Sequence, residues 1–389
     1  MSDWCTVRKP GPFLLLLLFV LVVIEALSYG VSGYLRAKGV FYEPQRVEDY
    51  AGYERARDPV LGWPTRLPDE TRDETGSRIV PAFSNTRVSC LSLYGDSWTW
   101  GGGRDEEAWG NVLSQLLGCR VANYGVGGYG TDQAYLRFLG NESDGAPMVF
   151  LGHLSENILR NVNQLRDLLY PGTSFGLKPR FILAQGGGLE LVPLPTPSEA
   201  EFRDLVVHPG KYLEHEYFLP GGDAGTALRG FPYTLSVLAS FRHFHVVSEL
   251  RREPWYAAFY ESDHPSQGLE ITARIFEAFQ REAQRRGKVP ILAVIATGLD
   301  LEYHREHGRW VYQSLVDRLE RRGLRVLNMG ERMLAAMGAG KPCRLLEAGD
   351  CGRHPDTKGW EVMARVVEAH LEAEGLVDAR LRPPSGPRP

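Results

Sequence analysis

Two hydrophobic periodicities alternate along most of this chain, and together they predict strands followed by helices. Short runs of consecutive apolar residues predict buried strands. Between these runs, apolar residues recur at the spacing of helices that bury one face, most clearly over residues 105–117. Further helices are predicted from about Thr131, over 267–286 and 304–322, and from about Gly359. The predicted strands cover residues 88–94, 119–124, 147–152, 289–297 and 324–329. This alternation predicts an α/β fold with about five parallel strands.

The alternation stops between residues 160 and 264, which we interpret as an inserted lid. Within it, residues 178–195 predict a β-hairpin, which has no place in a parallel sheet. Residues 36–85 are rich in Arg, Asp, Glu and Pro without sustained periodicity, so they predict a stalk or linker. The expected organisation is a membrane or signal segment (1–35), the stalk (36–85), the main domain (86–159 and 265–376), the lid (160–264) and a flexible tail (377–389).

The N-terminus carries Arg8 and Lys9 before the apolar run 13–24, which Glu25 interrupts. This run has the length of a signal-peptide core, and residues 26–28 offer a cleavage site. Alternatively, the span continues to Leu35 as a membrane anchor of about 23 residues, with tyrosines near its outer end. We favour the uncleaved anchor. In both cases the body lies outside the cytoplasm, periplasmic or extracellular, and it is secreted if the segment is cleaved.

Composition narrows the possible partners. The chain has 389 residues and a net charge of −4, so no basic field for nucleic acid is expected. Cys90 and Cys119 begin two neighbouring predicted strands, and Cys343 and Cys351 bracket one loop. Either pair can form a disulfide or remain as buried thiols, and neither has metal-ligand partners at a useful spacing. Nothing in the sequence indicates an oligomeric state.

Candidate chemistry gathers where predicted strands end. Ser97, in Gly95-Asp96-Ser97, follows the strand 88–94, at the edge of an α/β sheet where ligands bind. A second block, Asn123-Tyr-Gly-Val-Gly-Gly128, follows the next strand. Far along the chain, Asp350 and His354 place a carboxylate and an imidazole in one loop, the groups that activate a hydroxyl nucleophile.

These blocks, in this order, resemble the SGNH (GDSL-type) hydrolases, a family of esterases, lipases, carbohydrate deacetylases and some acyltransferases. The resemblance covers roughly residues 86–160 and 265–375 and implies a flavodoxin-like, three-layer α/β/α fold. It implies that Ser97 is the nucleophile, that His354 is its base, and that the backbone N–H groups of Ser97 and Gly128 bind the oxyanion. It implies neither a cofactor nor a metal.

Two blocks depart from the family pattern. A Gly-x-Asn-Asp turn is expected after the third strand, whereas this chain has Asn157 at a longer spacing. We take Asn157 as the side-chain donor of the oxyanion hole, with His153 and Ser155 as alternatives. The family's Asp-x-x-His becomes Asp350 and His354, four residues apart, so the catalytic set is Ser97, His354 and Asp350. The other carboxylates that can orient the imidazole are Asp356 and Glu347.

Three other motifs compete with this interpretation. Gly125-x-Gly127-x-x-Gly130 matches a dinucleotide fingerprint, but the acidic residue expected about 20 positions later is missing. Ser174 sits in a Gly-x-Ser-x-Gly pattern without the preceding strand that a nucleophile elbow requires. His264 precedes a helix in the middle of the chain and is expected to be structural.

The sequence therefore predicts a serine esterase that hydrolyses O-acyl esters, O-acetyl esters above all, through an acyl-enzyme on Ser97. The expected substrate is a small-molecule or polysaccharide ester outside the cytoplasm, and Trp98 and Trp100 either stack on a sugar or pack in the interior. The alternatives are an O-acyltransferase with the same site, an inactive glycan-binding module, and a nucleotide-dependent enzyme that uses residues 125–130.

Overall fold

A central parallel sheet organises the molecule. The computed structural model describes residues 11–44, 49–63, 70–171, 176–338 and 340–377. The strand order is β3-β2-β4-β8-β9, and every neighbouring pair is parallel. The strands are β2 (Ser89–Tyr94), β3 (Arg120–Asn123), β4 (Met148–Leu154), β8 (Val289–Ile295) and β9 (Val326–Asn328). This arrangement confirms the predicted α/β class and the flavodoxin-like order of the strands.

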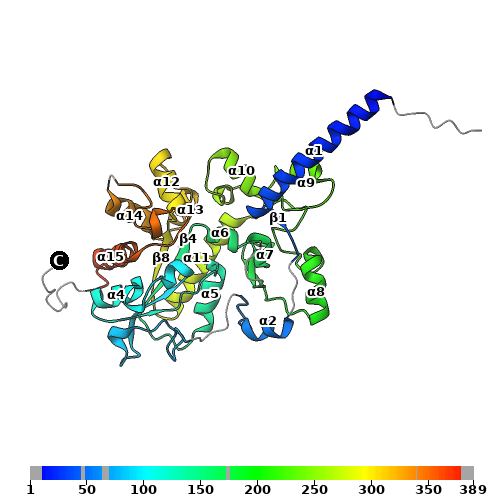
Figure 1. The fold of residues 1–389 in the computed structure, drawn as a ribbon. Coiled ribbons are helices and arrows are strands. Elements are labelled where there is room, and N and C mark those ends of the chain that lie inside the picture. The colour runs from blue at the N-terminus through cyan, green and yellow to red at the C-terminus, as the bar shows by residue number, and fades with distance from the viewer. Residues whose placement is uncertain (1–10, 45–48, 64–69, 172–175, 339, 378–389) are drawn as a thin grey trace, which may run out of the picture.

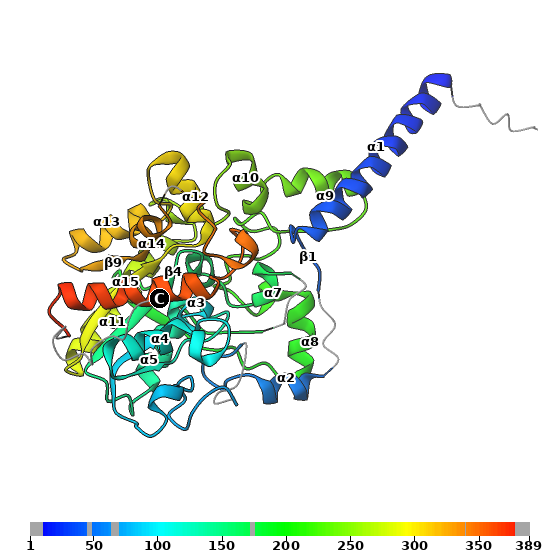
Figure 2. The same ribbon diagram turned by 60° about the vertical axis from the view of Figure 1, so that its left-hand side comes forward.

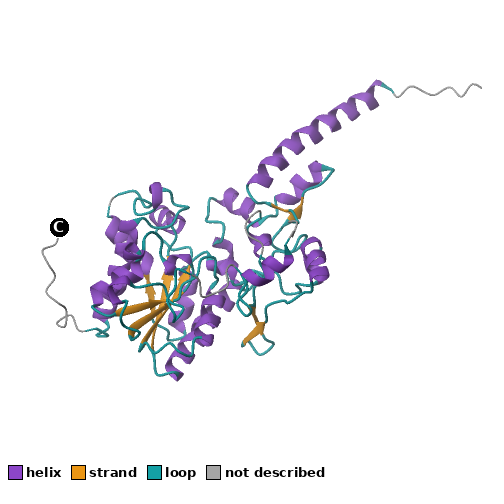
Figure 3. Cartoon of the chain, turned by 60° about the horizontal axis from the view of Figure 1, so that its bottom comes forward, coloured by secondary structure: helices purple, strands orange, loops and turns teal. Residues whose placement is uncertain are grey.

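Helices cover both faces of the sheet (Figure 3). One layer contains α4 (Trp109–Leu117), α14 (Met329–Met337) and α15 (Thr357–Ala373). The other layer contains α5 (Thr131–Gly140), α11 (Gly268–Arg285) and α13 (Gln313–Arg321). Phe150 in the middle strand packs against Trp109 of the first layer, with ring centroids 5.7 Å apart. Both side chains are fully buried, so the central strand is anchored at the core.

Two predicted helices are interrupted. The expected helix 304–322 is split into α12 (Gly298–His307) and α13, because Gly308 adopts a left-handed conformation with φ of +70°. The expected helix 105–117 is a 3-10 turn, η2 (Asp105–Glu107), followed by α4, since Ala108 between them is extended. The remaining predicted helices begin within about three residues of their expected positions.

The segment between β4 and β8 interrupts the parallel order, as the sequence indicates. It contains the predicted hairpin, whose strands pair in antiparallel fashion. Most of its buried hydrophobic residues belong to the same continuous core as the sheet. Its strands are β5 (Arg180–Leu183), β6 (Leu189–Val192) and β7 (Ala227–Leu228). Its helices are α6 (Asn157–Arg160), α7 (Arg166–Leu169), α8 (Glu199–Val207), η3 (Pro209–Lys211), α9 (Tyr233–Ser240), α10 (Phe244–Arg251) and η4 (Ala257–Tyr260). Whether this segment acts as a lid stays a prediction.

The expected stalk over residues 36–85 is wrong for the described part of that segment. Strand β1 (Phe41–Tyr42) pairs with β7, and both of its side chains are buried. Helix α2 (Tyr50–Ala56) places Tyr53 on Phe202 of α8, with ring centroids 4.6 Å apart. A 3-10 turn, η1 (Pro81–Phe83), leads into β2. The segment packs through scattered aromatic and arginine side chains, which produce no periodicity that a sequence pattern can show.

Two disulfides join the cysteine pairs that the sequence places together, Cys90–Cys119 and Cys343–Cys351. The first links the starts of the neighbouring strands β2 and β3, and the second closes the loop before α15. A disulfide removes conformational freedom from the unfolded chain, so both bonds favour the folded state.

Helix α1 (Pro12–Ala37) projects from the body, as Figures 1 and 2 show. Its side chains from Phe13 to Val23 are exposed, and it is long and apolar enough to cross a membrane. The helix is therefore compatible with the predicted membrane anchor.

Substitution of Phe150 tests the central strand. Phe150→Ala removes a fully buried ring and leaves a cavity against Trp109, so we expect a loss of about 3–5 kcal/mol in the free energy of unfolding. Val88→Ala serves as the control, because Val88 is 83% exposed and its loss is expected to cost little. Urea titration of both variants in detergent measures the difference, and equal stabilities would contradict this packing.

Candidate active site

Ser97 is held by the turn between β2 and the short helix α3 (Ser97–Trp100). The carboxylate of Asp96 caps this helix by accepting hydrogen bonds from the N–H groups of Trp98 and Thr99, at 2.9 and 3.4 Å. A Cβ at Gly95 would lie only 1.9 Å from the Thr99 hydroxyl oxygen, so the turn requires glycine there. The Gly-Asp-Ser sequence thus fixes the backbone on which the serine is presented.

His354 reaches Ser97 from the other end of the chain. Its Nε2 lies 2.9 Å from Ser97 Oγ, a hydrogen bond between residues 257 positions apart. His354 is exposed, whereas Ser97 is partly buried, so the pair opens to solvent. The Cys343–Cys351 disulfide and a backbone hydrogen bond from Glu347 N to His354 O hold the histidine loop. The structure therefore brings together the predicted nucleophile and base.

Asp350, by contrast, does not contact the imidazole. Its carboxylate accepts a hydrogen bond from the Gly352 N–H at 2.9 Å and lies 3.7 Å from the Arg353 guanidinium. The side chain of Asp350, one position farther from His354 than in the family pattern, thus interacts with its own loop. The carboxylate of Asp356 caps α15 by accepting from the Gly359 N–H at 2.8 Å.

The predicted orienting role of Asp350 is therefore wrong in this structure. The alternative carboxylates do not contact the imidazole either. Asp356 caps α15, and no hydrogen bond joins the side chain of Glu347 to His354. Over the described ranges, Nδ1 of His354 has no hydrogen-bond partner. Ser97 and His354 thus form a hydrogen-bonded pair, the dyad, and no carboxylate of the described residues bonds the imidazole.

The expected oxyanion-hole groups lie on the loops after the neighbouring strands. Gly128 has φ of +81°, a conformation that favours glycine. In the described part of the chain, the backbone N–H groups of Ser97 and Gly128 donate no hydrogen bond to another residue. Gly127 lies beside the nucleophile, because a Cβ there would be 3.9 Å from Ser97 Cβ. Two backbone donors are thus available next to the serine.

Asn157 begins α6, directly after β4, and is fully buried. Its Oδ1 accepts a hydrogen bond from Arg160 at 2.8 Å, whereas its Nδ2 has no partner among the described residues. A buried N–H₂ group without an acceptor costs free energy, so the position of this donor calls for an explanation.

The two alternatives to Asn157 are already occupied. His153 shares hydrogen bonds with Thr131 and Tyr260 at 2.6 and 2.9 Å, and burial lowers the pKa of His153 to about 3, so the ring is neutral. The hydroxyl of Ser155 donates to Asp300. Asn157 is the one of the three candidates with a free donor.

Arg160 is a site residue that the sequence reasoning missed. Its buried guanidinium contacts Asp96 Oδ2 at 3.2 Å, Tyr129 O at 3.2 Å and Asn157 Oδ1 at 2.8 Å. It therefore joins the loops that follow β2, β3 and β4. Burial raises the pKa of the Asp96 carboxyl, and the Arg160 charge opposes this shift. In the sequence, Arg160 simply follows Ile158 and Leu159, and this pattern does not distinguish a buried arginine from an exposed one.

The glycine motif over residues 125–130 packs closely against neighbouring backbone. A Cβ at Gly125 would lie 2.5 Å from the backbone nitrogen of Trp100. The carbonyl of Gly125 accepts a hydrogen bond from Arg72 at 2.7 Å. Because the motif packs against the nucleophile turn and Arg72, its glycines have a structural explanation that needs no nucleotide.

The two tryptophans near the serine are packing residues. Trp98 is buried beneath His354, with ring centroids 6.0 Å apart. Trp100 lies between the guanidinium groups of Arg72 and Arg78, at 4.2 and 4.6 Å from its ring centroid. Neither ring is an open platform for a sugar.

The two remaining candidates are His264 and Ser174. His264 hydrogen-bonds Ser266 at 2.8 Å before α11, so its expected structural role agrees with its contacts. Ser174 lies outside the described residues.

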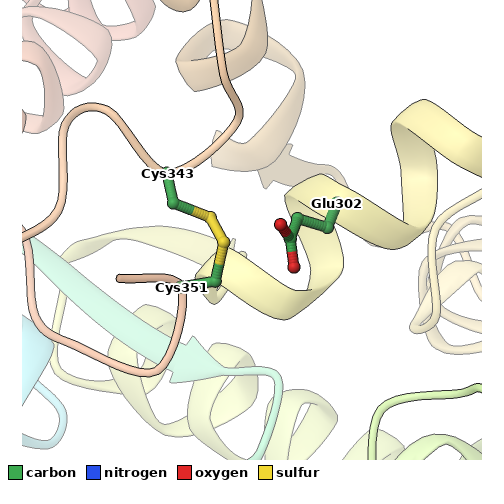
Figure 4. A group of neighbouring side chains, drawn as sticks. All are labelled: Glu302, Cys343 and Cys351. Carbon is green, nitrogen blue, oxygen red and sulfur yellow. A yellow bond between two sulfur atoms is a disulfide. The ribbon is translucent and has the colours of Figure 1, made fainter. Parts of the chain in front are cut away.

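One group of three potential metal ligands occurs among the described residues, Glu302, Cys343 and Cys351 (Figure 4). The two sulfur atoms are bonded to each other, so neither is a thiolate that can bind a metal. This cluster is a closed disulfide beside a carboxylate.

The Arg160–Asp96 pair can be tested by its effect on stability. Arg160→Ala leaves the fully buried Asp96 without its counter-charge, so we expect a loss of about 3–5 kcal/mol in the free energy of unfolding. Arg365→Ala is the matched control, because its ion pair with Glu361 is exposed and is expected to contribute about 0–1 kcal/mol. Urea unfolding of both variants decides the point, and similar losses would mean that the buried pair is not essential.

Comparisons with known proteins complete the description of the site. No protein-family model matches the sequence, and no curated protein is similar to it by sequence. Among solved structures, a lipolytic protein of the G-D-S-L family from Desulfitobacterium hafniense shares 13% identity, with 72% of this chain and 99% of that chain covered and a TM-score of 0.35. A G-D-S-L family member from Veillonella parvula shares 11%, with coverages of 72% and 96% and a TM-score of 0.34. Likeness at this level carries no conclusion about activity, and both neighbours bear the family name that the motifs of this chain resemble.

Proposed function

We propose that this chain is a serine esterase with Ser97 as nucleophile and His354 as base. The observation that carries the proposal is the 2.9 Å contact between His354 Nε2 and Ser97 Oγ at the carboxyl edge of a parallel sheet. A serine hydroxyl is a weak nucleophile until an adjacent base removes its proton, and this geometry supplies that base.

In the proposed mechanism, Ser97 Oγ attacks the ester carbonyl carbon while its proton passes to His354 Nε2. The carbonyl oxygen becomes an oxyanion that accepts hydrogen bonds from the N–H groups of Ser97 and Gly128 and from Asn157 Nδ2. The imidazolium then protonates the leaving alkoxide, and an acyl-enzyme remains on Ser97. A water molecule, deprotonated by His354, releases the acid in the same manner.

The absence of a contacting carboxylate shapes this mechanism. The imidazolium that forms at His354 has no described acidic partner, but the ring is exposed. Water can therefore accept the Nδ1 proton in a hydrogen bond and stabilise the charge. Such a dyad is expected to work without a fixed acidic residue, at a lower rate than a triad.

The substrate we propose is an O-acetyl ester on a glycan outside the cytoplasm. The support is the exposed dyad, which a polymer can reach, and the basic residues Arg8 and Lys9 before α1, which favour a cytoplasmic N-terminus. If a sugar hydroxyl replaces water in the second step, the same site is an O-acyltransferase.

Labelling of the serine tests the proposal directly. We expect a fluorophosphonate to form one adduct on Ser97, located by peptide mapping, and expect Ser97→Ala and His354→Ala to remove it. Ser143→Ala is the control, because Ser143 is exposed and away from the dyad, and it should keep the adduct. An unlabelled native protein would contradict the esterase and favour an inactive glycan-binding module.

A second pair of variants tests the proposed roles of Asn157 and Asp350 separately. Asn157→Ala removes one donor, so we expect kcat on an acetyl ester to fall about 10²–10³-fold. Asp350→Asn is the comparison, because that carboxylate faces Gly352 and Arg353, and we expect a fall of less than about tenfold against the roughly 10⁴-fold effect of losing a catalytic aspartate. Thermal unfolding of both variants checks that the fold is retained, and a larger effect at Asp350 would refute this assignment.

A further inference from the structure

Helix α9 (Tyr233–Ser240) lies against α1, although the two helices are about 200 residues apart in the sequence (Figures 1 and 2). Glu25, the acid that interrupts the apolar run of α1, joins them. Its carboxylate accepts hydrogen bonds from the backbone N–H groups of Tyr233 and Thr234 and from the Thr234 hydroxyl, the last at 2.7 Å. An acid in a membrane helix is costly unless it is paired, and α9 supplies its partners.

Further polar contacts continue along the same side of α1. The Thr234 hydroxyl lies 3.0 Å from Ser28 Oγ, and Arg229 Nε donates to Ser32 Oγ at 3.0 Å. The Arg229 guanidinium also lies 5.0 Å from the ring centroids of both Tyr29 and Tyr233. Tyrosine side chains gather where a membrane meets water, and arginines near helix ends reach the same level, so this cluster is expected at a membrane–water interface. Glu25 lies one helical turn, about 6 Å, deeper.

The side of α9 that faces away from buried Ser236 and Ser240 is apolar and exposed. Leu235 (61% exposed) and Leu238 (58%) are three residues apart on this face of the helix. Phe231 (78%) and Phe241 (55%) flank the two ends of α9, and the four side chains form the apolar stripe. The stripe also borders a cavity of about 590 Å³ lined by Leu228, Phe231, Leu235 and Ala239. Large exposed apolar patches mark surfaces that something else covers.

We propose that α9 and the turn before it are embedded in the outer face of the same membrane that α1 crosses. The inference rests on α1 as a membrane helix, and it does not depend on the esterase activity. The bilayer is the occupant because the stripe continues the exposed apolar surface of α1, to which α9 is attached by Glu25. Burial of these apolar side chains at the boundary of headgroups and acyl chains would stabilise this placement.

The contacts with α9 also bear on cleavage. Cutting after residue 28 would separate Glu25 and Ser28 from Thr234 and leave the start of α9 without these acceptors. The proposal therefore includes an α1 that is retained in the mature protein.

Lipid quenching of site-specific probes tests the proposal on the full chain in phosphatidylcholine vesicles. Cys5 is first replaced by serine, since the other four cysteines are in disulfides. A polarity-sensitive fluorophore is then attached at Leu238→Cys, at Leu18→Cys in α1, or at Val88→Cys on the body. We expect doxyl-labelled lipids to quench the probes at 238 and 18 and to leave the probe at 88 bright.

Each outcome separates the proposal from its premise. Quenching at 18 without quenching at 238 would leave the anchor intact and overturn the embedding of α9. No quenching at either position would overturn both. If the probe at 238 is shielded from both lipid and aqueous quenchers while the chain sediments as a dimer, a second copy covers the stripe and the proposal is wrong.

Discussion

The buried ion pair between Arg160 and Asp96 is the interaction on which the site depends. Asp96 fixes the turn that presents Ser97, and Arg160 holds Asp96, the carbonyl of Tyr129 and the amide oxygen of Asn157 at once. These three partners follow three adjacent strands, so one guanidinium sets the spacing of the loops that carry the proposed nucleophile and oxyanion donors. Nη1 makes these three contacts, and Nε and Nη2 of the same guanidinium bond Tyr170 and Glu156, so the planar group uses donors on all three of its nitrogens.

The histidine is positioned by a different principle. Its loop is closed by a disulfide and by backbone hydrogen bonds rather than by a carboxylate on the ring. The backbone of this loop thus positions the imidazole. In the proposed mechanism, water stabilises the protonated form of the ring. The loop of the proposed nucleophile is held by a buried ion pair, whereas the proposed base lies on the surface.

Much of this arrangement could be predicted from the sequence because it follows from local patterns. The apolar runs gave the five strands within about two residues, and the order of the motifs placed Ser97 and His354 together. The orientation of Asp350 could not be predicted, because one additional residue in a loop redirects a side chain and leaves no trace in any periodicity.

Long-range contacts could not be predicted either, because they leave no periodic pattern in the sequence. The apolar pattern of the helix expected over 304–322 continues across Gly308, although α12 ends at this left-handed glycine and α13 begins only at Gln313. The expected stalk packs on the body through the pairing of β1 with β7 and through aromatic contacts such as that of Tyr53 with Phe202. The partners of Glu25 lie 208 and 209 residues away in the sequence. Such contacts depend on the tertiary structure, and no window of sequence contains both partners.

The junction between α1 and the body has a mechanical consequence. Only Lys38, Gly39 and Val40 separate the end of α1 from β1, and β1 is paired with β7 inside the molecule. A linker this short leaves the body little freedom to swing or rotate about the helix. The hydrogen-bonded pair of Ser97 and His354 is therefore held in a set position and direction relative to α1.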